Sequence, residues 1–371
     1  MSKMSSPLGR RLDGTFSINQ WAIILFLLVA AIPLAFNFNL LQHMAVYDNQ
    51  QPPPSTPLQP LASSSQDDPE RTDCTKLLNK FKADEIEVAK KEGDVNFRRS
   101  FVTISKSVPN PFYIATHDKG IDGVRASIME YHDYYESRLT ELIANLFVKK
   151  HEEGKKSIFL DVGANIGWFS LVAAAHGATK VYSFEPNLQN TIRFCESLSL
   201  NGWATDDLVV PINKGAGTIE EKKNLYATDS NNPGAYSFKP MGSRAVVGEM
   251  EITTLDLFAE RHGWFESRPS IGFFKLDVEY FELEVMEGAK KLIRSQIIEM
   301  IGLELKPDHP ETTKYKICKL LLDSGYEFYM HGAWQGPDQL VTVNYVNVTQ
   351  LVADFQADKY KENVVFRLKD K

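Results

Sequence analysis

From residue 158 onward the chain alternates short apolar runs with turns and amphipathic segments. Residues 158–160 are apolar and end at Asp161, which is typical of a buried strand in a parallel sheet. After a turn, residues 168–176 predict a short helix of mostly small and apolar side chains. Residues 180–184 predict a second strand, which ends at Glu185. This order predicts a strand–helix–strand unit, and such units bind ligands at the carboxyl ends of their strands.

The turn of this unit reads DVGANIG, with Gly163 and Gly167 where the backbone turns tightly or lets a ligand approach. Glu185 is placed to accept hydrogen bonds from the two hydroxyls of a ribose, so we interpret the unit as a nucleoside-binding site. It differs from the dinucleotide fingerprint G-x-G-x-x-G, because Asn165 stands at the second glycine. The Asp161 carboxylate would repel a pyrophosphate but suits a ligand that carries an amine and a sulfonium. The alternative is a similar turn in another Rossmann-like enzyme.

The alternation continues to the C-terminus and predicts the rest of an α/β sheet. Residues 187–200 predict a crossover helix, residues 208–213 a third strand, and residues 271–279 a further strand. Residues 224–244 are polar and contain Gly and Pro, and we interpret them as an excursion beside the substrate. The same criteria predict strands at 101–104, 112–116, 252–256 (ending at Asp256), 300–306, 326–330 and 363–368, and helices at 74–93, 127–149, 281–294 and 315–324.

Several stretches together resemble a known family. The first reads DVGANIGWFS from Asp161, and later segments between residues 253 and 289 read TTLD, FKLDVE and FELEVMEGA. Their order resembles the FkbM family of S-adenosylmethionine-dependent methyltransferases, over roughly Glu136 to the C-terminus. Tyr280 stands where the family has a glycine, which puts a large side chain at a freely turning position. The resemblance implies a Rossmann-like class I methyltransferase fold: a mostly parallel seven-stranded sheet with helices on both faces, closed by an antiparallel hairpin partner.

The resemblance also implies the cofactor and the residues around it. The cofactor is expected to be S-adenosylmethionine, with Glu185 on its ribose and Asp161 near its amino-acid end. The residues expected to bind it are Asp161, Gly163, Asn165, Gly167, Glu185, Asn187 and Lys214.

Asp277 and Glu279 are the expected catalytic residues, because they end the strand at which such methyltransferases bring acceptor and methyl group together. Projecting from a strand, residues with this spacing point the same way, and two close carboxylates raise the pKa of one of them toward neutrality. That carboxylate can accept the proton of an acceptor hydroxyl as a general base. Other acceptor-side candidates are Glu136, Tyr280, Glu304 and His309.

Three alternatives stay open for this acidic pair. The pair could bind a divalent metal with Glu304 or His309 as a further ligand, but the ligand spacing is not compelling and we expect no metal. Lys275 and neighbouring loops could neutralise both acids in a purely structural arrangement. His309 or His331 could supply the base instead.

The N-terminal part of the chain predicts a membrane anchor. Residues 21–41 are uncharged and about as long as the ~20 residues that a spanning helix needs. Basic residues precede this stretch and none follows until Arg71, so the tail at 1–20 is expected in the cytosol and the rest in the lumen or outside. Residues 42–73 are rich in Pro, Ser and Gln and predict an extended spacer before a folded domain at 74–371. A cleaved signal peptide is the alternative, but the exit lacks a small-x-small site.

Composition and cysteine count narrow the function further. The net charge of −7 argues against nucleic acid as the main partner. Three cysteines allow at most one intramolecular disulfide, and Cys195, on the apolar face of its helix, is expected to be a small buried side chain rather than a nucleophile. Asn347 begins an N-glycosylation sequon, which agrees with a lumenal domain.

Together these features predict a single-pass type II membrane protein, of the plan seen in Golgi glycan-modifying enzymes. Its lumenal domain is expected to O-methylate a hydroxyl of a glycan or glycoconjugate. The alternatives are a methyltransferase for a lipid or small metabolite, and a catalytically silent binding protein that retains the fold. The departure at Tyr280 is the feature that favours the silent protein.

Overall fold

The computed structural model describes residues 68–81, 100–103, 110, 112–117, 120–129, 134–227, 232–240, 242, 244–306, 308–330, 341–342, 348–356 and 364–369, and the statements below concern these residues. Within them, no helix combines the length and the apolar composition that crossing a membrane requires. The predicted anchor at 21–41, most of the predicted spacer, His331 and Asn347 lie outside the described residues.

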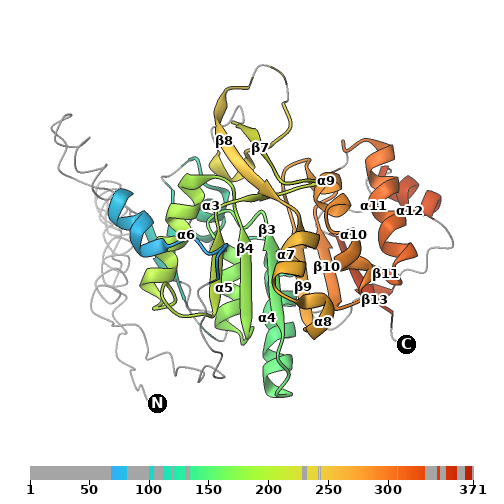
Figure 1. Cartoon of the computed structure of the whole chain (residues 1–371), viewed down its shortest axis with the longest axis horizontal. Coiled ribbons are helices and arrows are strands. Elements are labelled where there is room, and N and C mark those ends of the chain that lie inside the picture. The colour runs from blue at the N-terminus through green and yellow to red at the C-terminus, as the bar shows by residue number, and fades with distance from the viewer. Residues whose placement is uncertain are drawn as a thin grey trace, which may run out of the picture. The chain divides into compact units, whose positions relative to one another are not determined.

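A central eight-stranded sheet organises the domain (Figure 1). Its strands lie in the order β12 (Val341–Thr342), β11 (Tyr326–Met330), β13 (Val364–Leu368), β10 (Ile298–Leu303), β9 (Ile271–Leu276), β3 (Ile158–Val162), β4 (Lys180–Phe184) and β5 (Val209–Ile212). Neighbours from β10 to β5 pair in parallel, whereas β13 pairs antiparallel with both β10 and β11. The strands from β11 to β5 agree with the predicted α/β methyltransferase sheet. The predicted count of seven is wrong, because the two-residue strand β12 adds an eighth at the edge.

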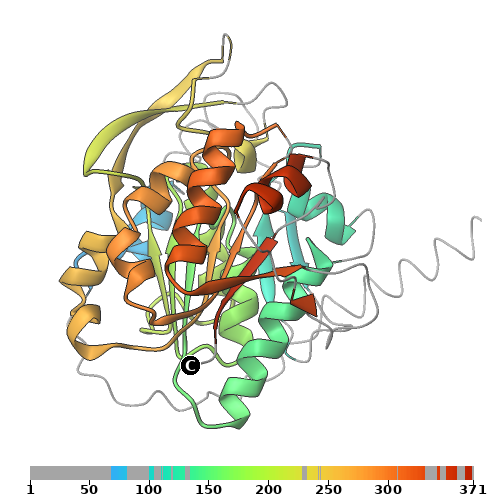
Figure 2. The ribbon, with the colours of Figure 1, turned by 90° about the vertical axis from the view of Figure 1, so that its right-hand side faces the viewer.

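Helices cover both faces of the sheet because side chains of successive strand residues point to opposite sides. In β3, Phe159 packs into one apolar cluster and Leu160 into the other. The helices that pack with Phe159 are α3 (Gly123–Met129), α4 (Ser137–Glu152), α5 (Trp168–Ala175) and α6 (Leu188–Leu200). Those that pack with Leu160 are α7 (Leu255–Arg261), α8 (Trp264–Ser267), α9 (Glu282–Glu287), α10 (Lys290–Arg294), α11 (Glu311–Asp323) and α12 (Val348–Gln356). Figure 2 shows the sheet between these layers, viewed from the side of α11 and α12.

A smaller sheet stands above the central strands in Figure 1. It contains β6 (Gly215–Ala216), β8 (Val246–Thr253) and β7 (Glu221–Tyr226), and a separate antiparallel pair is formed by β1 (Ser100–Thr103) and β2 (Tyr113–Thr116). The prediction of a strand that ends at Asp256 is wrong, because β8 ends earlier and Asp256 lies in α7. Its carboxylate accepts the backbone N–H groups of Lys291 (2.9 Å) and Leu292 (2.8 Å), and thereby holds the start of α10.

Two predicted helices are each divided in the structure. The predicted helix at 127–149 corresponds to α3 and α4, and the one at 281–294 to α9 and α10. The second division falls at Gly288, where a Cβ would lie 1.9 Å from the carbonyl oxygen of Gly217. The close approach of these two backbones requires glycine at this point.

The segment before residue 74 lies along the β5 edge of the central sheet. The backbone N–H of Thr72 donates to the carbonyl of Pro211 (2.8 Å), and the Thr72 hydroxyl accepts the N–H of Asn213 (2.9 Å). Residues 68–73, which were predicted to belong to the spacer, are therefore part of the folded domain.

A disulfide strengthens this attachment. Residues 74–81 are helical, and Cys74 at their start is bonded to Cys195 of α6. Cys195 is buried, as we predicted, but its pairing with Cys74 was not predicted. Cys318 is the remaining cysteine, and it is free and buried.

Candidate active site

The turn after β3 lies directly against the loop after β9. Gly163 and Gly167 have positive φ angles of 84° and 89°, which residues other than glycine rarely adopt. A Cβ on Gly163 would lie 1.7 Å from the carbonyl oxygen of Asp277, and one on Gly167 would lie 2.0 Å from a ring carbon of Phe194. Both positions therefore require glycine, and the first brings the two loops together.

Glu185, directly after β4, is held by hydrogen bonds from both sides. Its Oε2 accepts the backbone N–H of Asn165 (2.8 Å). Its Oε1 accepts the backbone N–H of Asn187 (2.8 Å) and the side-chain amide of Asn190 (3.4 Å). Burial raises the pKa of Glu185 to about 7, although these hydrogen bonds favour the ionised form. The carboxylate is thus oriented in advance of any ligand.

One cavity joins this carboxylate to the loop after β9. Its wall includes apolar and aromatic side chains with a few charged groups, which is typical of a small-molecule site. Residues of the segment 224–244, which was predicted to be an excursion beside the substrate, contribute to the wall. Residues of the wall include Tyr135, Gly163, Ala164, Asn165, Trp168, Phe169, Glu185, Asn187, Gly215, Ala216, Leu225, Pro233, Tyr236, Phe238, Lys275, Asp277 and Glu279.

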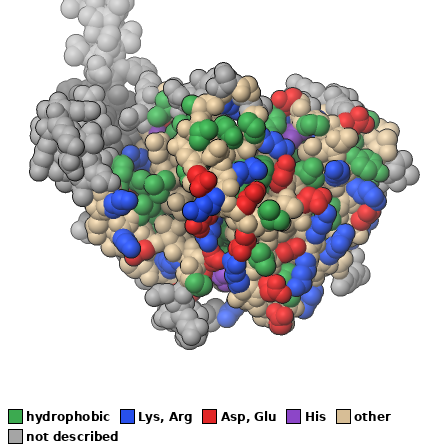
Figure 3. Space-filling view, turned by 45° about the horizontal axis from the view of Figure 1, so that its top comes forward, with side chains coloured by type: hydrophobic (Ala, Val, Ile, Leu, Met, Phe, Trp, Pro, Cys, Tyr) green, Lys and Arg blue, Asp and Glu red, His purple; other side chains and the backbone are tan. Residues whose placement is uncertain are grey.

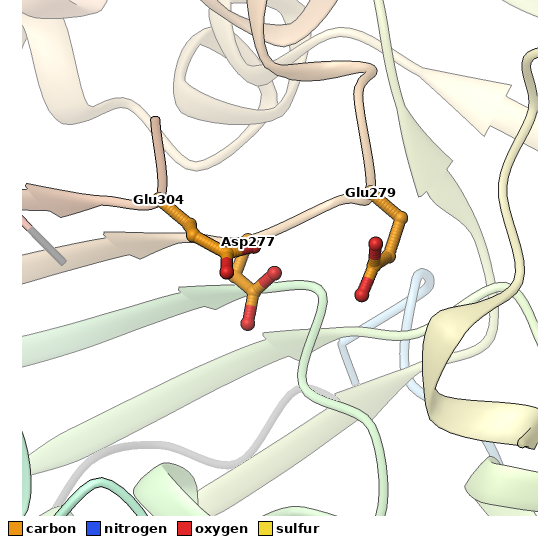
Figure 4. Close-up of side chains that lie close together, drawn as sticks. All are labelled: Asp277, Glu279 and Glu304. Carbon is orange, nitrogen blue, oxygen red and sulfur yellow. The ribbon is translucent and has the colours of Figure 1, made fainter. Parts of the chain in front are cut away.

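Three acids lie close together beside this cavity, and two of them, Asp277 and Glu279, line it (Figure 4). Asp277 and Glu279 come from the loop after β9 and Glu304 follows β10; one carboxylate oxygen of each lies within 4.8 Å of the others. Lys275 Nζ lies 3.2 Å from a carboxylate oxygen of Asp277. Lys306 Nζ lies 2.5 Å from Glu279 and 3.3 Å from Glu304. The acids and lysines therefore form one ion-pair network.

The electrostatics of this cluster agree with our prediction, but its backbone geometry does not. Burial raises the pKa of Glu279 and raises that of Glu304 to about 9, and the charge of Asp277 adds to both shifts. The predicted strand placement is wrong, because β9 ends before Asp277. Glu279 and Tyr280 have φ angles of 53° and 72°, so a tight turn brings the acids together.

Asp161, Gly167 and Lys214 do not line the cavity, contrary to the expected contact with the cofactor. The side chain of Asp161 is fully buried, and burial raises its pKa. It accepts a hydrogen bond from the Ser170 hydroxyl (2.6 Å) and lies 4.0 Å from Nζ of Lys275, which lines the cavity. Asp161 therefore contacts a residue of the cavity wall rather than the cavity itself. Lys214 points away and pairs with Glu70 (2.6 Å), while the two residues that follow it line the cavity.

All four acceptor-side candidates, Glu136, Tyr280, Glu304 and His309, also lie outside the cavity wall. The Tyr280 hydroxyl donates to Asp308 (2.7 Å), and its ring centroid lies 4.8 Å from that of His309. His309 is buried, with Nε2 2.8 Å from a carboxylate oxygen of Glu282, so it is not positioned as a base. Glu136 immediately precedes α4 and has a φ of 44°. Its negative charge, after those of Asp277 and Asp161, contributes to raising the pKa of the buried Lys275.

The sequence did not predict the parts played by Lys306, Asn190 and Pro233. The side-chain amides of Asn187 and Asn190 both donate to the carbonyl of Pro233 at 3.1 Å. These bonds tie the segment above the cavity to the start of α6. One signal was present: Asn190 follows Asn187 by three residues, which places both on one side of a helix.

The acidic cluster also tests the metal alternative. Asp277, Glu279 and Glu304 supply oxygen ligands of the kind that Mg²⁺ or Ca²⁺ binds. The Lys306 ammonium, however, already contacts two of these carboxylates. The arrangement therefore fits an ion-pair network better than a metal site.

A comparison with protein families identifies the family to which the central part of the chain is similar. Residues 161–328 match the model of the methyltransferase FkbM domain. These residues belong to the FkbM methyltransferase family. The FkbM match begins in β3 and ends in β11, so it contains both Glu185 and the acidic cluster. S-adenosylmethionine is the cofactor.

The chain is also similar to solved methyltransferase structures. The SAM-dependent methyltransferase from Agrobacterium tumefaciens is 11% identical with a TM-score of 0.35, over 75% of this chain and 72% of that one. The SAM-dependent O-methyltransferase from Thermotoga maritima is 11% identical with a TM-score of 0.33, over 73% of this chain and 78% of that one. Similarities this low carry no argument about function. No curated protein matches the chain.

Proposed function

We propose that this protein transfers a methyl group from S-adenosylmethionine to a hydroxyl of a glycan or glycoconjugate in the secretory pathway. The observation that carries the proposal is that Glu185, Asp277 and Glu279 line one cavity. A carboxylate suited to the donor's ribose and carboxylates suited to an acceptor hydroxyl therefore face the same space. S-adenosylmethionine, when bound, supplies the electrophilic methyl group.

The acids at the acceptor end have different tasks in this proposal. Methyl transfer is an in-line displacement, so much of the catalysis is positioning of the acceptor oxygen. Glu279 fits the role of general base, since burial raises its pKa toward the range in which a carboxylate takes up a proton efficiently. Glu304, which shares Lys306 with Glu279, lies outside the cavity wall, so we assign it no contact with the acceptor. Asp277, which forms an ion pair with Lys275, is the second carboxylate on the acceptor side.

The charge pattern supports an uncharged polyhydroxyl acceptor. Each lysine of the cluster pairs with an acid, and Lys275, Asp277 and Glu279 line the cavity, so this end offers both hydrogen-bond donors and acceptors. Acidic and basic side chains are also interspersed over the face shown in Figure 3. A nucleic-acid partner would favour a continuous basic surface instead.

The compartment is proposed from the sequence and from one covalent bond. Disulfides persist mainly in oxidising compartments, and Cys74 is bonded to Cys195. This bond agrees with the secretory placement proposed from the apolar stretch at 21–41 and from the sequon at Asn347. We therefore propose a type II topology in a Golgi or other secretory membrane.

The alternative of a catalytically silent protein loses the feature that favoured it. A bulky Tyr280 was expected to narrow the acceptor site. Its side chain instead points to Asp308 and does not line the cavity. The alternative of a lipid or small-metabolite acceptor remains an outcome of the experiment below.

Transfer of tritium from S-adenosylmethionine labelled on its methyl group tests the proposal. The full-length protein in detergent is offered three separate fractions from cells that lack it: released glycans, lipids and small metabolites. We expect label in the glycan fraction, and none with the Asp277→Asn variant as control. Label only in the lipid or the small-metabolite fraction would show that the acceptor is not a glycan. Donor binding without transfer to any fraction would favour the catalytically silent protein.

A further inference from the structure

Glu282 is a buried carboxylate that the chemistry described above does not use. It lies in the first turn of α9 and is 0% exposed. Its Oε1 accepts the backbone N–H groups of Val278 (3.3 Å) and Tyr280 (3.2 Å). Because these two groups flank Glu279, the Glu282 side chain holds the backbone on both sides of the acceptor-side acid.

This stretch of backbone requires support because its conformation is unfavourable. Glu279 and Tyr280 have φ angles of 53° and 72°, in the left-handed region that favours glycine. The Ser237 hydroxyl donates to the Glu279 carbonyl at 2.5 Å and adds a further restraint. Without the bonds to Glu282, we expect the turn to relax and to carry the Glu279 carboxylate away from Asp277.

The second oxygen of Glu282 reaches the other side of the cluster. Its Oε2 lies 2.8 Å from Nε2 of His309, which is 4% exposed. Nδ1 of the same ring lies 3.2 Å from the carbonyl oxygen of Lys306, whose ammonium pairs with Glu279. Glu282 and His309 therefore connect the loop after β9 with the loop after β10.

We propose that the buried Glu282–His309 pair is a positioning unit that sets the Glu279–Lys306 ion pair at the acceptor side of the site. It acts through backbone groups and lines no part of the cavity. The proposal rests on the acceptor side proposed above, but its first test needs no acceptor. The two backbone N–H groups donate to a single oxygen atom of Glu282, and the side chain of glutamine also carries such an oxygen. Glu282→Gln should therefore keep both hydrogen bonds, whereas Glu282→Ala should lose them.

Hydrogen–deuterium exchange of the full-length protein in detergent tests this proposal directly. Glu282→Ala is expected to accelerate exchange at the Val278 and Tyr280 amides by about tenfold or more, as the loss of hydrogen bonds to a charged group predicts. Glu282→Gln is expected to keep their protection. Glu284→Ala is the matched control, because this neighbouring acid of α9 pairs with Lys239 at 3.3 Å and should leave the exchange unchanged.

Unchanged exchange at both amides in Glu282→Ala would overturn the proposal. If that variant does not fold, Glu282→Asp provides the same test, since its shorter side chain moves the carboxylate away from both amides. We expect faster exchange in this variant also, and full protection in it would equally overturn the proposal.

Kinetics then separate positioning from general stability. With the tritium assay, Glu282→Ala is expected to lower turnover while the affinity for S-adenosylmethionine stays unchanged, and Glu282→Gln to restore most of the turnover. In a Glu279→Gln background, Glu282→Ala should add no further loss, because it acts through Glu279. Additive losses would contradict the proposal. If the wild-type protein methylates no fraction, the proposed function fails, while the exchange experiment still decides the positioning role.

Discussion

Protonation of Glu185 should control the affinity for the donor near neutral pH. Burial raises the pKa of this carboxyl to about 7 in the unliganded protein, whereas a ribose diol requires the ionised form as acceptor. Binding should therefore weaken as the pH falls through about 7. At pH 6 about one tenth of the groups would be ionised, so the affinity should be about tenfold lower than at pH 8, or about 1.4 kcal/mol.

The raised pKa of Glu185 affects the free energy of unfolding in the opposite direction to donor affinity: as the pH rises, donor binding strengthens and the fold is stabilised less. Because the pKa of Glu185 is higher in the fold than its ordinary value of 4.5, its contribution to the free energy of unfolding falls as the pH rises from 4.5 to about 7. Bound donor offsets this loss, so ligand-induced stabilisation should grow over the same interval.

Glu185→Gln provides the test. The variant loses a charge-assisted hydrogen bond, so at pH 8 its affinity should fall by about 1.5–3 kcal/mol. Between pH 6 and pH 8 it should lack the tenfold pH effect of the wild-type protein. Isothermal titration with S-adenosylhomocysteine at several pH values measures both quantities, and the ligand's own titration is common to both proteins. Equal pH profiles for variant and wild type would refute this account of Glu185.

Three other changes test the site and its frame. Glu279→Gln should leave the melting temperature nearly unchanged but lower turnover by about 10²-fold or more, as measured by tritium transfer, because it removes the general base. Gly163→Ala should abolish donor binding, because its Cβ would lie 1.7 Å from a backbone oxygen, whereas Gly154→Ala, with a φ of 66° and open space around it, should retain binding. Cys74→Ser should lower the free energy of unfolding by about 2–5 kcal/mol in urea titrations. Reductant should have a comparable effect on the wild-type protein and none on this variant.

Local patterns predicted the centre of the fold well. The bounds predicted for the strand at 180–184 are those of β4, because an apolar run ends there at a charged residue that belongs at the sheet edge. Glu185 and Asp277 were placed at the same edge for the same reason, and the structure places both in one cavity. In such segments the pattern along the chain alone determines which side chains are buried.

The features that the sequence did not predict depend on contacts between distant residues. Cys74 and Cys195 are 121 residues apart, and nothing local indicates their pairing. His309 and Glu282 are 27 residues apart, so the sequence suggested a base or a metal ligand and did not indicate the buried pair. The strand predicted to end at Asp256 was wrong, because the partners of this carboxylate at the start of α10 lie in another segment, and periodicity carries no information about them.

The most direct test of the central claim is a crystal structure of the protein with S-adenosylhomocysteine bound. The account predicts that the ribose hydroxyls lie within hydrogen-bond distance of the Glu185 carboxylate. It also predicts that the sulfur atom faces the end of the cavity formed by Asp277 and Glu279. A nucleoside bound away from Glu185, or a sulfur atom directed away from these acids, would contradict it.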